Sequence, residues 1–120
     1  MVDVRVQNTT RGTVLAERAG LAVGYWDRLK GLLGREGLPE GSGLWLQPCN
    51  SVHMWFMRFP IDVVFATKEG RVVAIVPTLR PWAMTRPYFG AAVALELPVG
   101  MIARTGTAPG DQLIQEPACA

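Results

Sequence analysis

The sequence predicts a mainly β fold, a compact barrel or jelly-roll-like sandwich of about seven or eight short strands with one short α-helix. Three observations support it: short runs rich in β-branched residues recur, 13 glycines and 9 prolines are spread between them, and helical periodicity is confined to one segment. With 49% hydrophobic and 18% charged residues, the 120-residue chain can bury a core, which excludes general disorder. We expect a single domain over residues 1–115 and a flexible tail at 116–120.

The N-terminal half of the chain is expected to supply three strands. Residues 2–6 alternate valine with polar residues, which is the period of a half-buried strand. Residues 13–19 are its expected hairpin partner, joined through residues 8–12. Residues 44–47 form a short run bounded by glycine and proline, and this pattern predicts the third strand.

One segment has the periodicity of a helix. Between Trp26 and Leu33, apolar residues recur at i, i+3, i+6 and i+7, and the charged residues fall on the opposite face. Gly34 or Gly37 can end such a helix, because glycine readily adopts the left-handed conformation common at helix C-termini. The sequence therefore predicts one amphipathic helix that caps the sheet.

The second half of the chain is expected to supply four more strands. Residues 61–66 and 71–76 are rich in β-branched residues and flank a four-residue turn. A positive φ at Gly70 would close these two runs into a hairpin. Residues 91–97 and 111–114 complete the set.

The net charge and the cysteine content limit the kinds of partner and the cellular compartment that are expected for this chain. The net charge of +2 does not by itself imply a nucleic-acid or membrane partner, and no nucleic acid is expected. No run approaches the roughly 18 apolar residues of a membrane span. Cys49 and Cys119 make no disulfide framework and suit a reducing compartment. Residues 1–10 lack the apolar core of a signal peptide, so a cytoplasmic location is expected.

Familiar cofactor motifs are missing from the sequence. The patterns GxGxxG, HExxH, GxSxG and CxxC do not occur, nor does a P-loop. Most familiar cofactor chemistries therefore lose support, and no cofactor is expected. The expected partner is a small molecule or a protein.

The segment 49–62 has the highest density of chemically useful side chains. It holds the only histidine, His53, together with one of the two cysteines and two of the five methionines. If the segment is extended, His53, Trp55 and Met57 share one face. His53 could act as a general base or as a metal ligand, or it could be a structural ring held by hydrogen bonds.

Soft metal ligands occur in the same segment. Cys49, His53, Met54 and Met57 suit monovalent copper, although their spacing matches no established motif. The alternative is that the methionines and Cys49 are core residues, because both types pack well in apolar surroundings. The local signature of a cysteine protease around Cys49 is missing.

Two carboxylates interrupt apolar strands. Asp62 lies within the run 61–66 and Glu96 within the run 91–97. A carboxylate in such a run either faces water or is buried with a partner. Available partners are Arg58, Arg80, Arg86 and Arg104. In the functional alternative both carboxylates line the mouth of a pocket and perform acid–base work.

Arginine and aromatic residues alternate in the segment 78–90. Arg80 and Arg86 each precede a proline and then an aromatic residue. Such a loop could stack on bases or sugars and clamp a phosphate or a carboxylate. In the alternative interpretation it is a covering loop that packs Trp82 and Phe89 over one end of the barrel.

Six short blocks of the sequence resemble the bacterial and archaeal family called domain of unknown function 192. The resemblance covers residues 13–115 and implies a compact β-barrel or jelly-roll-like domain with a short helix. It implies no activity. Many members of the family carry an export signal, whereas none is expected in this sequence. The blocks are Gly31-Leu32-Leu33-Gly34-Arg35, Gly43-Leu44-Trp45-Leu46, His53-Met54-Trp55-Phe56-Met57, Pro60-Ile61-Asp62-Val63-Val64-Phe65, Ala94-Leu95-Glu96-Leu97-Pro98-Val99-Gly100 and Gly110-Asp111.

The leading functional hypothesis is a non-enzymatic domain that binds a small ligand or a partner in an apolar pocket. One alternative is a small hydrolase-like enzyme that uses His53 with Asp62 or Glu96 for acid–base catalysis. The other is a copper site at Cys49, His53 and Met57. The residues expected to line the pocket or its mouth are His53, Trp55, Met57, Asp62, Trp82, Arg86 and Glu96.

Overall fold

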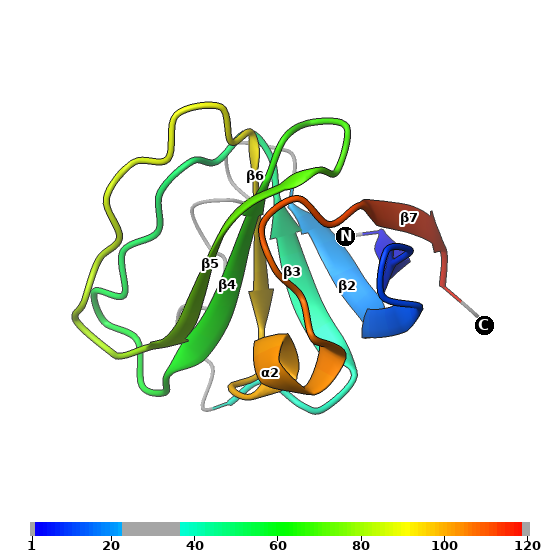
Figure 1. The fold of residues 1–120 in the computed structure, drawn as a ribbon. Coiled ribbons are helices and arrows are strands. Elements are labelled where there is room, and N and C mark those ends of the chain that lie inside the picture. Colours follow the sequence, from blue (N-terminus) through cyan, green and yellow to red (C-terminus); the bar gives the residue numbers. More distant parts are fainter. Residues whose placement is uncertain (1, 23–36, 119–120) are drawn as a thin grey trace.

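The computed structural model describes residues 2–22 and 37–118, and this part of the chain is mainly β, as predicted. Its seven strands form one sheet, and its one short helix follows the sixth strand (Figure 1). The elements are β1 (Asp3–Asn8), β2 (Thr13–Ala22), β3 (Ser42–Leu46), β4 (Ile61–Ala66), β5 (Val72–Leu79), β6 (Val93–Leu97), α2 (Met101–Thr105) and β7 (Leu113–Pro117).

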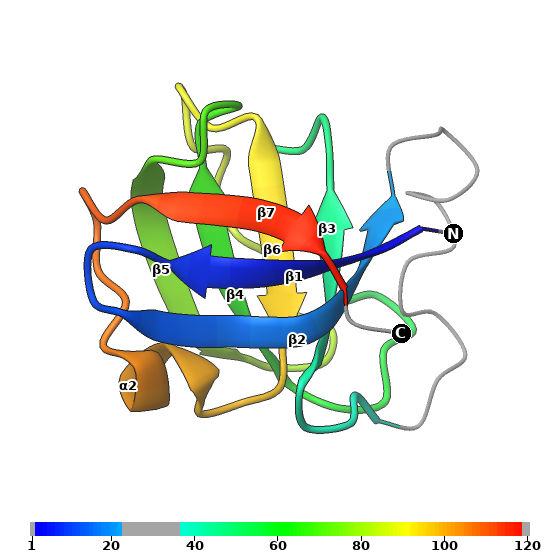
Figure 2. The ribbon, with the colours of Figure 1, turned by 90° about the vertical axis from the view of Figure 1, so that its right-hand side faces the viewer.

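The sheet curls into a half-barrel with the strand order β5-β4-β6-β3-β2-β1-β7. Figure 2 shows β1, β2 and β7 crossing in front of β3, β4, β5 and β6. The two edge strands approach each other at one corner, where Arg71 and Gln112 form an isolated bridge. At this corner the Leu113 amide also donates to the Gly70 carbonyl oxygen at 2.8 Å. The corner therefore brings the sheet close to closure.

Both faces of the central strands are covered. Along β4 the side chains alternate, with Val64 in an inner cluster inside the curl and Val63 and Phe65 in an outer cluster on the other face. All six residues of β4 are buried, which explains why this strand is almost continuously apolar. The outer cluster is covered by the segments 47–60 and 80–92, which supply Met54, Ala83 and Tyr88 among others.

Both predicted hairpins are confirmed. Strands β1 and β2 pair antiparallel, and so do β4 and β5. Gly70 has a φ of 91°, as the turn requires. Strand β7 runs through Glu116 and Pro117, two residues into the predicted tail. There Glu116 pairs with Arg5 of the neighbouring strand at 2.9 Å.

The helix that the structure describes is not the helix that the sequence predicts. The predicted helix between Trp26 and Leu33 lies outside the described residues. Helix α2 has five residues, too few to produce a hydrophobic period. The amides of Gly100 and Ile102 at its N-terminal end donate to the carboxylate of Asp62, which is distant in sequence. The helix therefore depends mainly on a tertiary contact rather than on a local sequence pattern. Within residues 2–22 and 37–118, no helix is long and apolar enough to cross a membrane.

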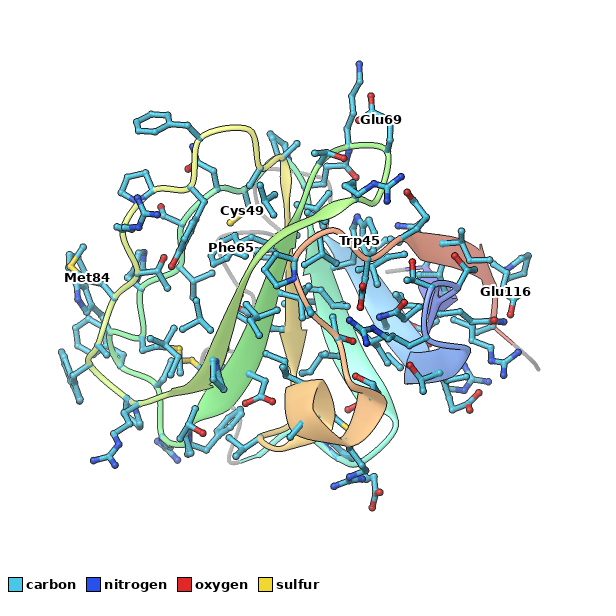
Figure 3. All side chains as sticks on the ribbon, viewed as in Figure 1. Trp45, Cys49, Phe65, Glu69, Met84 and Glu116 are labelled. Carbon is cyan, nitrogen blue, oxygen red and sulfur yellow. The ribbon has the colours of Figure 1, made fainter. Side chains whose placement is uncertain are left out.

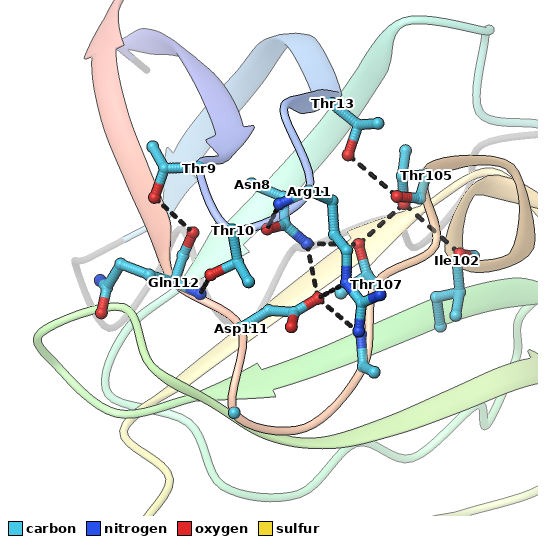
Figure 4. A network of polar contacts seen from close by, with 12 residues as sticks. Asn8, Thr9, Thr10, Arg11, Thr13, Ile102, Thr105, Thr107, Asp111 and Gln112 are labelled. Atoms are coloured by element: carbon cyan, nitrogen blue, oxygen red, sulfur yellow. Dashed lines mark hydrogen bonds and ion pairs between the residues drawn. The ribbon is translucent and has the colours of Figure 1, made fainter.

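A buried polar network ties the first hairpin to the segment after α2 (Figure 4). The Oδ2 atom of Asp111 accepts hydrogen bonds from Arg11 Nε at 2.9 Å, from Asn8 Nδ2 at 3.0 Å and from the Ala108 amide at 3.0 Å. The hydrogen bond from Arg11, followed by that from Asn8, lowers the pKa of Asp111 to about 2. Asp111 therefore has a structural role, which accounts for the Gly-Asp block in the sequence.

The approach of the two sheet edges makes a prediction about Gly70. A Cβ atom at this position would lie 2.3 Å from the Leu113 carbonyl oxygen, and φ is positive. Gly70→Ala should therefore reduce the free energy of unfolding, measured by urea denaturation, by more than about 2 kcal/mol. The matched control is Gly90→Ala, because Gly90 has a similar φ of +92° and nothing within 4 Å of its Cβ position. Equal losses in the two variants would contradict the steric argument.

Candidate functional site

The segments 47–60 and 80–92, which we call the paired loops, run antiparallel over the outer cluster (Figure 1). Backbone hydrogen bonds join them along their length, so the two segments behave as one ribbon rather than as independent loops. These bonds are Cys49 N to Ala92 O at 2.9 Å, Tyr88 N to Asn50 O at 2.9 Å, Thr85 N to Val52 O at 2.8 Å, Met54 N to Ala83 O at 2.7 Å and Trp82 N to Met54 O at 2.8 Å.

The segment from His53 to Met57 is not extended, so the condition under which His53, Trp55 and Met57 would share one face is not met. A tight turn reverses the chain here, because Phe56 has a φ of 64° and the Met57 amide donates to the Met54 carbonyl oxygen. His53 and Trp55 are exposed on the outside, and their rings lie 4.7 Å apart. Met57 is buried in the outer cluster together with Met54. The turn therefore separates the predicted pocket residues.

The turn and the neighbouring loop build an exposed apolar surface. We call His53, Trp55, Phe56, Trp82 and Met84 the aromatic ridge. The exposed fractions are 46% for Trp55, 70% for Phe56, 62% for Trp82 and 64% for Met84. The rings of Phe56 and Trp82 lie 5.0 Å apart, and a β-bridge places His53 beside Met84. Figure 3 shows Met84 at the outer edge of the molecule.

The covering-loop interpretation of the segment 78–90 is only partly right. The loop does cover the outer cluster, through Ala83 and Tyr88. Trp82 and Phe89, which were expected to pack over the barrel, are 62% and 87% exposed. Because the inward positions of the loop hold other side chains, the two large aromatic residues remain in water.

Backbone strain is concentrated at the aromatic ridge. Among the described residues other than glycine, those with positive φ are Phe56, Thr78 and Trp82. A left-handed φ at such residues costs on the order of 1–3 kcal/mol each, and it persists only where the surroundings enforce it. Phe56 and Trp82 also carry exposed rings of the ridge. The strained backbone therefore holds side chains that are exposed rather than buried.

The paired loops carry cations and no carboxylate. Arg58, Arg80 and Arg86 are exposed on them. The guanidinium carbon of Arg86 lies 4.6 Å from the centre of the Tyr88 ring, which is a cation–π contact. The contact that the structure gives the predicted ligand residue Arg86 is therefore to Tyr88, two residues further along the same loop.

Asp62 is a buried structural carboxylate. Its Oδ1 accepts a hydrogen bond from the Thr78 amide at 2.9 Å, and its Oδ2 accepts from the amides of Gly100 at 3.1 Å and Ile102 at 3.0 Å. The last two donors belong to the first turn of α2, where a negative charge also complements the helix dipole. The partners of Asp62 are therefore backbone amides, whereas the sequence had suggested arginines.

Asp62 and Glu96 lie on opposite faces of the sheet. In the antiparallel pair of β4 and β6, Asp62 is opposite Leu97 and Glu96 is opposite Val63. Directly opposed residues point to the same face, and neighbours along a strand point to opposite faces. Glu96 therefore lies on the face of the outer cluster, and Asp62 lies on the inner face. The two carboxylates cannot line the mouth of one pocket.

Glu96 is a carboxylate in apolar surroundings. It is 7% exposed and is flanked across the sheet by Leu44 and Val63. Burial raises the pKa of Glu96 to about 7. A raised pKa is a property shared by catalytic carboxylates and by buried structural ones.

The three residues of the copper alternative have different surroundings. His53 is exposed, Met57 is buried in the outer cluster, and the thiol of Cys49 donates to the Ser51 carbonyl oxygen at 3.1 Å. Within the described ranges, no three His, Cys, Asp or Glu side chains gather where they could hold a metal ion.

The structure also contains an open cavity that the sequence did not indicate. Its volume is about 310 Å³, and it lies between β7, the turn that joins β4 to β5, and the end of β3. Three segments far apart in the sequence contribute to it, so no local pattern could have revealed it. Its lining residues are Trp45, Gln47, Lys68, Glu69, Gly70, Leu113, Ile114 and Gln115.

The contacts of Asp62 predict a structural rather than a catalytic effect of substitution. Asp62→Asn replaces one acceptor oxygen by an NH₂ group that faces backbone N–H donors. We expect the free energy of unfolding to fall by about 2 kcal/mol or more, measured by urea denaturation. Glu69→Gln, at an exposed carboxylate in a turn, is the control and should change stability by less than about 0.5 kcal/mol. Unchanged stability of Asp62→Asn would refute the structural role.

The burial of Glu96 predicts a pH-dependent stability. Folding raises its pKa from 4.5 to about 7, so the folded state holds the proton more tightly. The resulting stabilisation is complete below pH 4.5 and is lost as the pH rises through 7. Glu96→Gln should therefore match the wild type in acid and exceed its unfolding free energy by about 3 kcal/mol above neutral pH. Parallel stability profiles of the two proteins would contradict the assignment.

The chain has relatives among known proteins. The family model DUF192, described as "Uncharacterized ACR", matches residues 6–115. A UPF0127 protein of Thermococcus sibiricus is 31% identical over 88% of this chain and 71% of its own length. A UPF0127 protein of Pyrococcus furiosus is 31% identical over 88% of this chain and 93% of its own length.

The fold matches that of a solved structure. A protein of unknown function from Novosphingobium aromaticivorans superposes with a TM-score of 0.78 at 29% identity, over 93% of this chain and 83% of that one. The family match spans nearly all of the sequence and includes the paired loops, the buried residues Asp62 and Glu96, and the Asp111 network. The chain therefore belongs to the domain of unknown function 192 family.

Proposed function

We propose that this chain is a non-enzymatic binding domain whose recognition surface is the aromatic ridge. The observation that carries the proposal is the exposure of four large apolar side chains, between 46% and 70%, on one hydrogen-bonded ribbon. Scattered exposed apolar residues are normal in soluble proteins, whereas a contiguous group commonly marks an interaction site. Tryptophan and arginine are also the residue types that contribute most to binding energy at interfaces.

The ridge is preorganised for binding. Its backbone is fixed by hydrogen bonds between the paired loops, and its underside is anchored in the outer cluster by Met54 and Ala83. A partner would therefore not have to order these loops, which lowers the entropic cost of association. The strained φ angles of Phe56 and Trp82 support the same interpretation, because the fold maintains them while their rings stay exposed.

The contacts of the carboxylates favour binding over acid–base catalysis. The Asp62 carboxylate lies on the inner face and is occupied by three backbone amides, whereas Glu96 is buried on the outer face and His53 is exposed. His53 stacks on Trp55 at the surface. In the proposed function His53 and Arg86 contribute to the polar margin of the binding surface, and the partner combines apolar groups with negative charge.

An anionic aromatic dye, 8-anilinonaphthalene-1-sulfonate, tests the proposal because it combines the two properties expected of the partner. The folded wild type should bind the dye, and the double variant Phe56→Asn, Trp82→Asn should bind it about tenfold more weakly. Asparagine tolerates left-handed φ, so the loop backbone is retained. Val99→Ser, at a residue that is 40% exposed and outside the ridge, is the control. Equal dye binding by all three proteins would refute the proposal.

A further inference from the structure

We infer that the partner of the aromatic ridge is the surface of an anionic lipid bilayer. This inference rests on the proposed function, because it names the partner of the same surface. Three features of the described residues carry it: the segregation of the exposed carboxylates from the paired loops, the hydrogen bonding of the backbone at the tip of the ribbon, and the kinds of side chain on the ridge.

The exposed carboxylates are segregated from the paired loops. The segments 47–60 and 80–92 contain three arginines and no Asp or Glu. In Figure 3, Met84 marks the end with the ridge, and Glu69 and Glu116 lie well away from it. An anionic surface is thus attracted to the paired loops, which favours an approach with the ridge facing that surface. The remainder of the described chain exposes both signs of charge, including Arg11, Lys68 and Arg104. The exposed carboxylates of the described residues are Asp3, Glu17, Glu40 and Glu69.

Three backbone amides at the tip of the ribbon are hydrogen-bonded within it. The amides of Trp82 and Ala83 donate to the carbonyl oxygens of Met54 and Arg80, and the Met57 amide also donates to Met54. An unpaired backbone amide in the region of lipid headgroups and acyl chains loses its water and costs free energy. The amides of Met57, Trp82 and Ala83, which are already bonded, can enter that region without this cost.

The side chains of the ridge suit the interfacial region of a bilayer. Tryptophan is enriched there because its large ring is apolar and its N–H group is polar. Phe56 adds a fully apolar ring, and Met84 adds a flexible apolar side chain. Their exposed fractions are 70% and 64%. A bilayer accommodates such protruding groups without a preformed pocket. Arg80 and Arg86 flank the ridge in sequence, where they can reach phosphate groups.

Co-sedimentation of the full chain with vesicles tests this inference. The wild type should sediment with vesicles of phosphatidylcholine mixed with phosphatidylglycerol, and much less with vesicles of phosphatidylcholine alone. Phe56→Asn with Trp82→Asn should weaken binding to the mixed vesicles about tenfold. Arg80→Gln should weaken it about fivefold, and added salt should reduce it further. The controls Val99→Ser and Lys68→Gln lie outside the paired loops and should bind as the wild type does.

The outcomes separate this inference from the proposed function. If the wild type binds the mixed vesicles no better than phosphatidylcholine alone, or if the ridge variant binds as well as the wild type, the bilayer assignment is overturned. If an acidic aromatic peptide or an oligonucleotide binds in place of vesicles and the ridge variant loses that binding, the partner is a protein or a nucleic acid and the proposed function stands. If the dye does not bind the ridge either, the proposed function fails too.

Discussion

Inside the sheet, the carboxylate of Asp62 joins three parts of the chain that are far apart in sequence. It lies on β4 and binds the Thr78 amide near the end of β5 and two amides at the start of α2. Thr78 adopts a left-handed φ of 51°, and the second of the paired loops begins directly after this strand. The position of that loop, and therefore of Trp82, depends on a buried carboxylate that accepts backbone hydrogen bonds. Because all three donors are rigid backbone groups, the carboxylate fixes direction as well as distance.

The two faces of the central strands are covered in different ways. The inner face is covered by other strands of the same sheet, whereas the outer face is covered partly by the paired loops. A loop that covers a core must turn some side chains inward and the rest outward. Here Met54, Met57 and Tyr88 turn inward, and Phe56 and Trp82 remain outside. The aromatic ridge is thus the outward side of the loops that cover the outer cluster. Covering the cluster does not require large aromatic side chains at these outward positions.

Three buried carboxylates show how environment separates chemically similar groups. Asp62 accepts hydrogen bonds from three backbone amides, while Glu96 is flanked across the sheet by Leu44 and Val63, and burial raises its pKa to about 7. Asp111 is the opposite extreme, because hydrogen bonds from Arg11 and Asn8 hold its pKa near 2. Partner geometry, rather than residue type, decides which of these groups is a fixed charge and which can exchange a proton near neutral pH.

The sequence by itself determined the strands and the two hairpins, because these depend on local patterns: the period of two at residues 2–6, the β-branched runs around β4 and β5, and the positive φ at Gly70. Only the tertiary structure decided the face on which each functional candidate lies. A strand's faces are assigned by its register with a partner about thirty residues away, and that register separated Asp62 from Glu96. The turn at Phe56 is held by the second loop, so the exposure of Trp55 and the burial of Met57 could not follow from the sequence of that segment alone.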